Sequence, residues 1–125
     1  MARILVIDDD DGVRRVVVRV LATAGHAVRH TDRVTSALKL WRDEPADLVV
    51  TDIAMPDMTG FERIITLRAE GATVPIIAIS GSLVVSDVEL INQVQRLGGV
   101  QLLAKPFSNE QLLAAVSSAL AVATD

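Results

Sequence analysis

Five polar residues stand where short apolar segments of the sequence end. They comprise three carboxylates, one hydroxyl and one ammonium group: Asp8, Asp9, Asp52, Ser80 and Lys105. Crowded carboxylates repel one another, which raises a pKa unless a cation lies among them. Oxygen ligands without His or Cys suit Mg²⁺, and a lysine with a serine hydroxyl can neutralise and hydrogen-bond a phosphoryl group. If the fold brings these residues together, they can hold a divalent metal and a phosphoryl group.

Short apolar, β-branched runs predict the strands that carry these residues. Such runs are typical of strands buried on both faces of a parallel sheet. The strands are expected at residues 3–7, 27–30, 48–52, 75–80 and 100–104. Ligands of open parallel sheets bind at the carboxyl ends of the strands, which share one edge. The sheet is therefore expected to gather the five polar residues at that edge.

Helical patterns alternate with these strands. Asp10 or Asp11 can cap the first helix, and Ser108 with Gln111 makes a capping box at the start of the last. Apolar residues at helical spacing predict helices over about residues 13–24, 34–41, 61–70, 86–97 and 109–120. Five strands alternating with five helices predict an α/β fold, a doubly wound parallel sheet covered on both faces.

Composition narrows the class of protein. The 125 residues suffice for one domain, and with 50% hydrophobic but only 2% aromatic residues the core must be built from Val, Leu, Ile and Ala. A net charge of −4 without a dense basic run argues against direct nucleic-acid binding. The lack of cysteine excludes disulfides and thiolate zinc sites. No apolar run reaches membrane-spanning length, and the start turns acidic too soon for a signal peptide, so we expect a cytoplasmic protein.

Four motifs carry a resemblance to a known family. They are VIDDD in the first strand, DLVVTDIAMPDMTG around the third, AISGS in the fourth and AKPF after the fifth. In this order and spacing the chain resembles, over essentially its whole length, the receiver domain of bacterial two-component response regulators of the single-domain, chemotaxis-regulator type. The resemblance implies a flavodoxin-like five-stranded sheet of order 2-1-3-4-5. It also implies that residues 1–125 form a single receiver domain without an output domain.

The resemblance also assigns a role to each polar residue. Asp52 would be the phosphoacceptor, and Asp9 would bind Mg²⁺ together with Asp52 and the carbonyl of Ala54. Asp8 would help through a metal-bound water, Ser80 would bind a phosphoryl oxygen, and Lys105 would pair with the phosphoryl group or Asp52. The Lys105-Pro106 peptide would be cis.

The implied function is signalling and not turnover of a separate substrate. A histidine kinase or histidine phosphotransferase would donate a phosphoryl group from phosphohistidine to Asp52. The domain would catalyse its own phosphorylation and slow dephosphorylation, and would signal to a downstream protein by a conformational change. No direct nucleic-acid or membrane partner is expected.

Some positions depart from the family pattern. Leu102 stands where the family often has a switch aromatic, so we expect a partner surface on the fourth helix, fifth strand and last helix that is weakly coupled to Asp52. Ala54 and Ser82 offer little to hold an attacking water. The segment between Ser80 and Lys105 is slightly long, and its apolar residues 83–85 could equally join the core or contact a partner.

Three rival functions are open to such a sequence. An Asp-nucleophile phosphatase needs a second Asp two residues after the nucleophile, where this chain has Ala54. A flavin carrier would share the fold, but the acidic first loop would repel its phosphate. A phosphorylation-independent interaction domain, or pseudo-receiver, would not need the intact set of polar residues. His26 and His30, which lie around the second strand, are given no chemical role.

Overall fold

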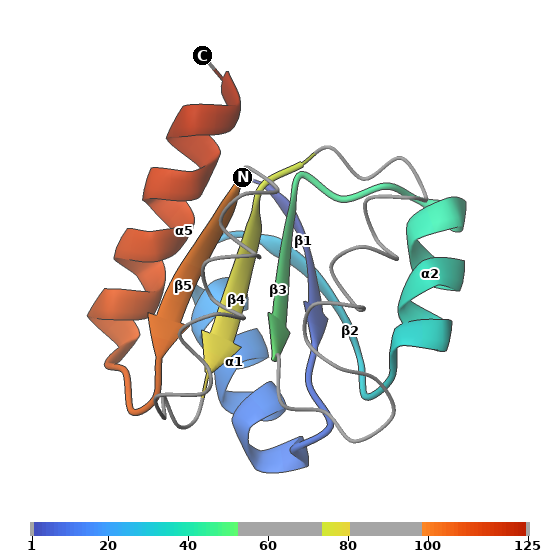
Figure 1. Cartoon of the computed structure of the whole chain (residues 1–125), viewed down its shortest axis with the longest axis horizontal. Helices are drawn as coiled ribbons and strands as arrows, with labels where there is room; N and C mark the ends of the chain where they lie inside the picture. The colour runs from blue at the N-terminus through green and yellow to red at the C-terminus, as the bar shows by residue number, and fades with distance from the viewer. Residues whose placement is uncertain (1, 53–73, 81–98, 125) are drawn as a thin grey trace, which may run out of the picture.

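A computed structural model describes residues 2–52, 74–80 and 99–124. Its five strands form one parallel sheet in the order β2-β1-β3-β4-β5. The strands run in the same direction, so their carboxyl ends lie along one edge, at the bottom of the view in Figure 1. The strand bounds are β1 Arg3–Ile7, β2 Ala27–Thr31, β3 Leu48–Asp52, β4 Ile76–Ser80 and β5 Val100–Ala104. The predicted fold class and strand order are confirmed.

Three helices lie within the described residues, and they cover both faces of the sheet. They are α1 Asp11–Thr23, α2 Val34–Asp43 and α5 Asn109–Thr124. Helices α1 and α5 pack on one face and α2 on the other (Figure 1). The helices expected near residues 61–70 and 86–97 fall outside the described residues. No helix in the described part of the chain is long and apolar enough to span a membrane.

Alternation along the strands builds a separate core on each face. In β1, Ile4 and Val6 face the α1 and α5 side, whereas Leu5 and Ile7 face the α2 side. Since successive side chains of a strand point to opposite faces, a strand covered on both sides must be apolar throughout. Trp41, the only tryptophan, is 6% exposed and fills the α2 side.

Helix α1 has clear signals at both ends. Asp10 is its N-cap, and its carboxylate accepts a hydrogen bond from the Val13 backbone N–H at 3.1 Å. At the other end Gly25 has φ +96°, and the N–H of His26 donates to the carbonyl of Leu21. This is a Schellman motif, in which glycine accepts the left-handed conformation without strain. It turns the chain directly into β2.

The capping box predicted for the last helix is confirmed. The Ser108 backbone N–H donates to Gln111 Oε1 at 2.8 Å, and the Gln111 N–H donates to Ser108 Oγ at 3.0 Å. Both donors would otherwise lack intrahelical partners. The box fixes the start of α5 four residues after Lys105, so it helps to set the course of the loop that carries this lysine.

Candidate functional site

Adjacent strands bring the three acids together at the carboxyl edge of the sheet. β1 and β3 pair in parallel with Ile7 opposite Thr51, so the residues that follow or end the two strands lie side by side. Carboxylate oxygens of Asp8, Asp9 and Asp52 all lie within 4.8 Å of one another. Asp8 and Asp52 are buried, with 1% and 4% exposure, whereas Asp9 is exposed.

Lys105 reaches this acidic cluster from β5, across the end of β4. Its Nζ lies 3.1 Å from Asp52 Oδ2, and its side chain is 24% exposed. The Lys105-Pro106 peptide is cis, as the family resemblance implied. The ammonium group therefore supplies a positive charge directly against the buried Asp52 carboxylate.

Asp8 has a buried carboxylate oxygen that is not hydrogen-bonded within the described residues. Its Oδ1 accepts a hydrogen bond from the Asp10 N–H at 2.9 Å, but its buried Oδ2 has no hydrogen-bond partner among the described residues. Burial raises the pKa of Asp8 to about 6; the Asp10 N–H and Lys105 act to lower it, and Asp52 and Asp9 act to raise it. An unpartnered carboxylate oxygen in a buried acidic cluster is a place where a cation is stabilised.

The donor set fits Mg²⁺. The candidate side-chain ligands are the converging carboxylates of Asp8, Asp9 and Asp52. The Oδ2 of Asp8 has no hydrogen-bond partner among the described residues. Hard oxygen ligands with open positions for water and phosphate are the surroundings that Mg²⁺ prefers. Ala54, whose carbonyl was the fourth expected ligand, lies outside the described residues.

Ser80 lies at the same edge as the acids and the lysine. It ends β4, the strand between β3 and β5, and pairs in register with Ala104, the residue before Lys105. The structure thus brings the ends of β1, β3, β4 and β5 to the region where the sequence predicted a metal and phosphoryl site.

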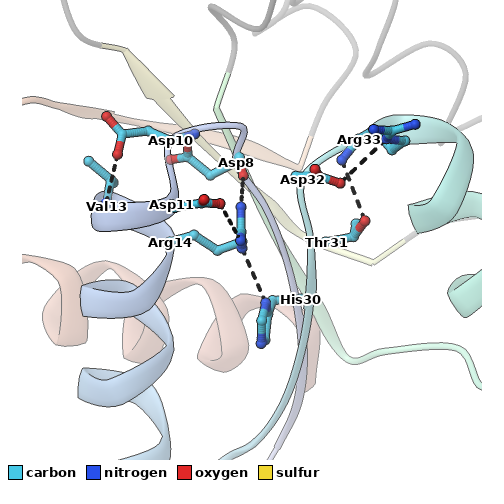
Figure 2. Close-up of polar contacts among 9 residues, drawn as sticks. All are labelled: Asp8, Asp10, Asp11, Val13, Arg14, His30, Thr31, Asp32 and Arg33. Carbon is cyan, nitrogen blue, oxygen red and sulfur yellow. Dashed lines mark hydrogen bonds and ion pairs between the residues drawn. The ribbon is translucent and has the colours of Figure 1, made fainter.

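Sequence reasoning missed a second polar network beside the acids. Arg14 on α1 contacts the Asp8 backbone, Asp11 and His30, which join three elements around the end of β1 (Figure 2). His26 also has a structural role, because its Nδ1 accepts a hydrogen bond from the Ala2 N–H at 3.2 Å. Only the spacing of Asp11 and Arg14, three residues apart on a helix, could have suggested a contact.

An apolar hollow of about 450 Å³ adjoins Lys105. Val16, one of its lining residues, is 54% exposed and is the one exposed large hydrophobic residue in the described part of the chain. Its lining comes from α1 and the segment after β5: Gly12, Val13, Val16, Val17, Lys105, Pro106 and Phe107. Exposed apolar surface of this kind often contacts another protein.

Comparison with known proteins identifies the class. The family model described as response regulator receiver domain matches residues 4–117. The chain therefore belongs to the response regulator receiver domain family, as the four motifs predicted.

The chain is also similar in sequence to individual regulatory proteins. The chain is 37% identical over 117 residues to the transcriptional regulatory protein FixJ of Azorhizobium caulinodans, covering 92% of this chain and 53% of FixJ. It is 31% identical to the regulatory protein AtoC of Escherichia coli, covering 94% of this chain and 25% of AtoC. The chain thus spans about half or a quarter of the length of these curated relatives.

Solved structures give the same assignment. The chemotaxis response regulator CheY4 of Vibrio cholerae superposes with a TM-score of 0.83 at 28% identity, covering 95% of this chain and 98% of CheY4. NtrX of Brucella abortus superposes with a TM-score of 0.88 at 27% identity, covering 98% of this chain and 27% of NtrX.

Proposed function

We propose that residues 1–125 form one receiver unit that accepts a phosphoryl group from a phosphohistidine onto Asp52. The donor would be a sensor histidine kinase or a histidine phosphotransferase. The observation that supports this most strongly is the buried Asp52 carboxylate, paired at 3.1 Å with Lys105 and within 4.8 Å of the carboxylates of Asp8 and Asp9. A nucleophilic carboxylate beside a fixed cation is what phosphoryl transfer to an acid requires.

The chemical step uses the carboxylate as the nucleophile. An oxygen of Asp52 forms a bond to phosphorus while the bond from phosphorus to the imidazole nitrogen breaks, and its electron pair stays on the imidazole. The product is an acyl phosphate. Lys105 faces the developing charge on the phosphoryl oxygens, and the Ser80 hydroxyl would donate a hydrogen bond to one of them. Because Lys105 is already held in place, little reorganisation is needed when that charge develops.

The acidic cluster would hold Mg²⁺ through Asp9 and Asp52, with the Ala54 carbonyl as a further ligand and Asp8 acting through a bound water. When bound, Mg²⁺ would offset the charge of the carboxylates and of the incoming phosphoryl group. Asp8 supports this assignment, since its buried Oδ2 has no other partner among the residues that the structure describes.

Protein partners would act on both sides of the reaction. The apolar hollow that ends at Lys105 gives a phosphodonor protein a surface to bury beside Asp52. A downstream protein would bind the phosphorylated form on β5, α5 and the segment 86–97, where the sequence predicts the fourth helix. Leu102 lies on β5 and is partly buried against the α2-side core. When a leucine side chain moves into or out of a pocket, the change in shape is smaller and less directional than when an aromatic ring does so. We therefore expect incomplete switching.

A labelling experiment tests the phosphoacceptor. A small phosphodonor such as acetyl phosphate, with Mg²⁺, should add the mass of one phosphoryl group to the protein. Asp52→Asn should not be labelled, because an amide cannot form the acyl phosphate. Asp43→Asn, which changes an exposed acid at the end of α2, should be labelled like the unchanged protein.

Two results would contradict the proposal. Undiminished labelling of Asp52→Asn would place the phosphoryl group elsewhere. No labelling of the unchanged protein by either a small donor or a phosphohistidine protein would favour a domain that binds partners without phosphorylation.

A further inference from the structure

Arg14 ties together three elements around the acidic cluster (Figure 2). Its Nη1 donates to the backbone carbonyl of Asp8 at 2.8 Å, and its Nη2 donates to Asp11 Oδ1 at 2.5 Å. Its Nε donates to His30 Nδ1 at 3.2 Å. The side chain is only 13% exposed. Each of the three guanidinium nitrogens thus donates one hydrogen bond: to Asp8, which directly follows β1, to Asp11 on α1 and to His30 on β2.

The carbonyl that Arg14 binds belongs to the peptide group between Asp8 and Asp9. Asp8 is otherwise held by its backbone N–H, which donates to the Thr31 carbonyl, and by its Oδ1, which accepts from Asp10. No side-chain hydrogen bond fixes the exposed carboxylate of Asp9 within the part of the chain that the structure describes. The orientation of the Asp8–Asp9 peptide therefore decides whether the Asp9 carboxylate points towards Asp8 and Asp52.

We propose that Arg14 is a positioning residue for the metal site. It fixes the Asp8–Asp9 peptide in the orientation in which the carboxylates converge. His30 and Asp11 hold the Arg14 guanidinium in place through hydrogen bonds. The inference rests on the Mg²⁺ site of the proposed function. It assigns to Arg14 an action through the Asp8 carbonyl and no contact with the metal.

The sign of the effect separates positioning from simple electrostatics. Arg14 carries a positive charge and contacts the backbone of Asp8 in the acidic cluster, so a purely Coulombic role would oppose cation binding. Its removal would then strengthen Mg²⁺ binding. If Arg14 positions the ligands, its removal must weaken binding in spite of the more favourable charge.

Calorimetric titration of the metal-free protein with Mg²⁺ at pH 8 tests this sign. Arg14→Met should weaken Mg²⁺ binding roughly tenfold, the lower end of the range for losing an outer-shell partner. Arg15→Met is the matched control, because Arg15 is the next residue of α1, is exposed and makes no hydrogen bond or ion pair with any described residue. It should bind Mg²⁺ equally or slightly more tightly. Arg14→Met binding that equals or exceeds that of Arg15→Met would overturn the inference.

Two further variants separate positioning from loss of structure. Arg14→Lys keeps the positive charge but lacks the forked guanidinium group, so it should also weaken Mg²⁺ binding. If Arg14→Met does not fold, Arg14→Lys is used for the test in its place. His30→Leu should weaken binding less, and should add nothing when combined with Arg14→Met, since both act through one contact. Unchanged binding by Arg14→Lys, or additive losses in the double variant, would contradict the proposal.

A spectroscopic readout follows the peptide group itself. The Asp9 amide nitrogen shares the peptide plane of the Asp8 carbonyl, so its chemical shift in the metal-free protein should change in both Arg14 variants. It should not change in Arg15→Met. If the unchanged protein binds no Mg²⁺, the proposed metal site fails and the inference fails with it. If the protein binds Mg²⁺ normally and only the Arg14 results disagree, the proposed function stands without this inference.

Discussion

Replacing Asp8 with asparagine should make the metal-free protein more stable at pH 8, by on the order of 3 kcal/mol. Asp8 is 1% exposed, and burial raises its pKa from 3.8 to about 6. At pH 8 the Asp8 carboxylate is ionised, and burying its charge lowers the free energy of unfolding. An asparagine carries no charge, and its side-chain oxygen can still accept the Asp10 hydrogen bond.

The pH dependence identifies this cause. Because the folded pKa is raised, the penalty is absent below about pH 4, grows between pH 4 and pH 6, and is complete above that window. The advantage of Asp8→Asn over the unchanged protein should therefore fall to roughly half at pH 5. Urea unfolding at pH 5 and pH 8 in the presence of a chelator measures both differences, with Asp43→Asn as the exposed control.

Mg²⁺ should act in the opposite direction on the same pair of proteins. A metal that binds the folded state stabilises it by mass action, and the unchanged protein should gain more than Asp8→Asn does. Since binding needs the ionised carboxylate, Mg²⁺ affinity of the unchanged protein should decrease below pH 6. An Asp8→Asn variant that is less stable than the unchanged protein at pH 8 without metal would contradict this description of the site.

Replacing Lys105 with methionine should slow phosphorylation by a small donor about 10²- to 10³-fold, the usual effect of removing one fixed donor from a site of developing charge. The ammonium lies 3.1 Å from Asp52 Oδ2, and the lysine side chain is only 24% exposed, so its charge is partly shielded from water. Methionine keeps much of the apolar stem but cannot offset charge on the phosphoryl oxygens. The rate of mass increase with acetyl phosphate at saturating Mg²⁺ gives the comparison.

The control for Lys105 is Lys39→Met, an exposed lysine on α2 that should be phosphorylated at the unchanged rate. Circular dichroism of both variants checks that the sheet is intact. A Lys105→Met protein that is folded and labelled as fast as the control would remove Lys105 from the mechanism.

The strands and the edge they share could be predicted from the sequence because both follow from local composition. The bounds of β1 and β5 agree with the predicted ranges, since mainly apolar segments there end at polar residues. Parallel strands then bring Asp8, Asp52 and Lys105 to one edge without any further information. The capping box of Ser108 and Gln111 is equally local, because both partners lie within one helical turn.

The distribution of burial and the Arg14 network could not be predicted in the same way. Asp8 is buried and Asp9 exposed, although the two are neighbours of identical chemistry. Arg14 is enclosed and Arg15 exposed because the rotation of α1 about its axis faces only one of them towards β1 and β2. That rotation is set by packing of Val17 and Leu21 against the sheet, which is a tertiary effect. The functional roles assigned to Asp8, Asp9, Asp52, Ala54, Ser80 and Lys105 stay predictions.

Chemical trapping of the phosphorylated residue tests the central claim most directly. Borohydride reduces an aspartyl phosphate to homoserine, and tandem mass spectrometry of the digested protein then locates the altered residue. After treatment with acetyl phosphate and Mg²⁺, homoserine should be found at position 52 and should be absent when Mg²⁺ is replaced by a chelator. Homoserine at position 8 or 9, with an unaltered Asp52, would contradict the assignment of Asp52 as the phosphoacceptor.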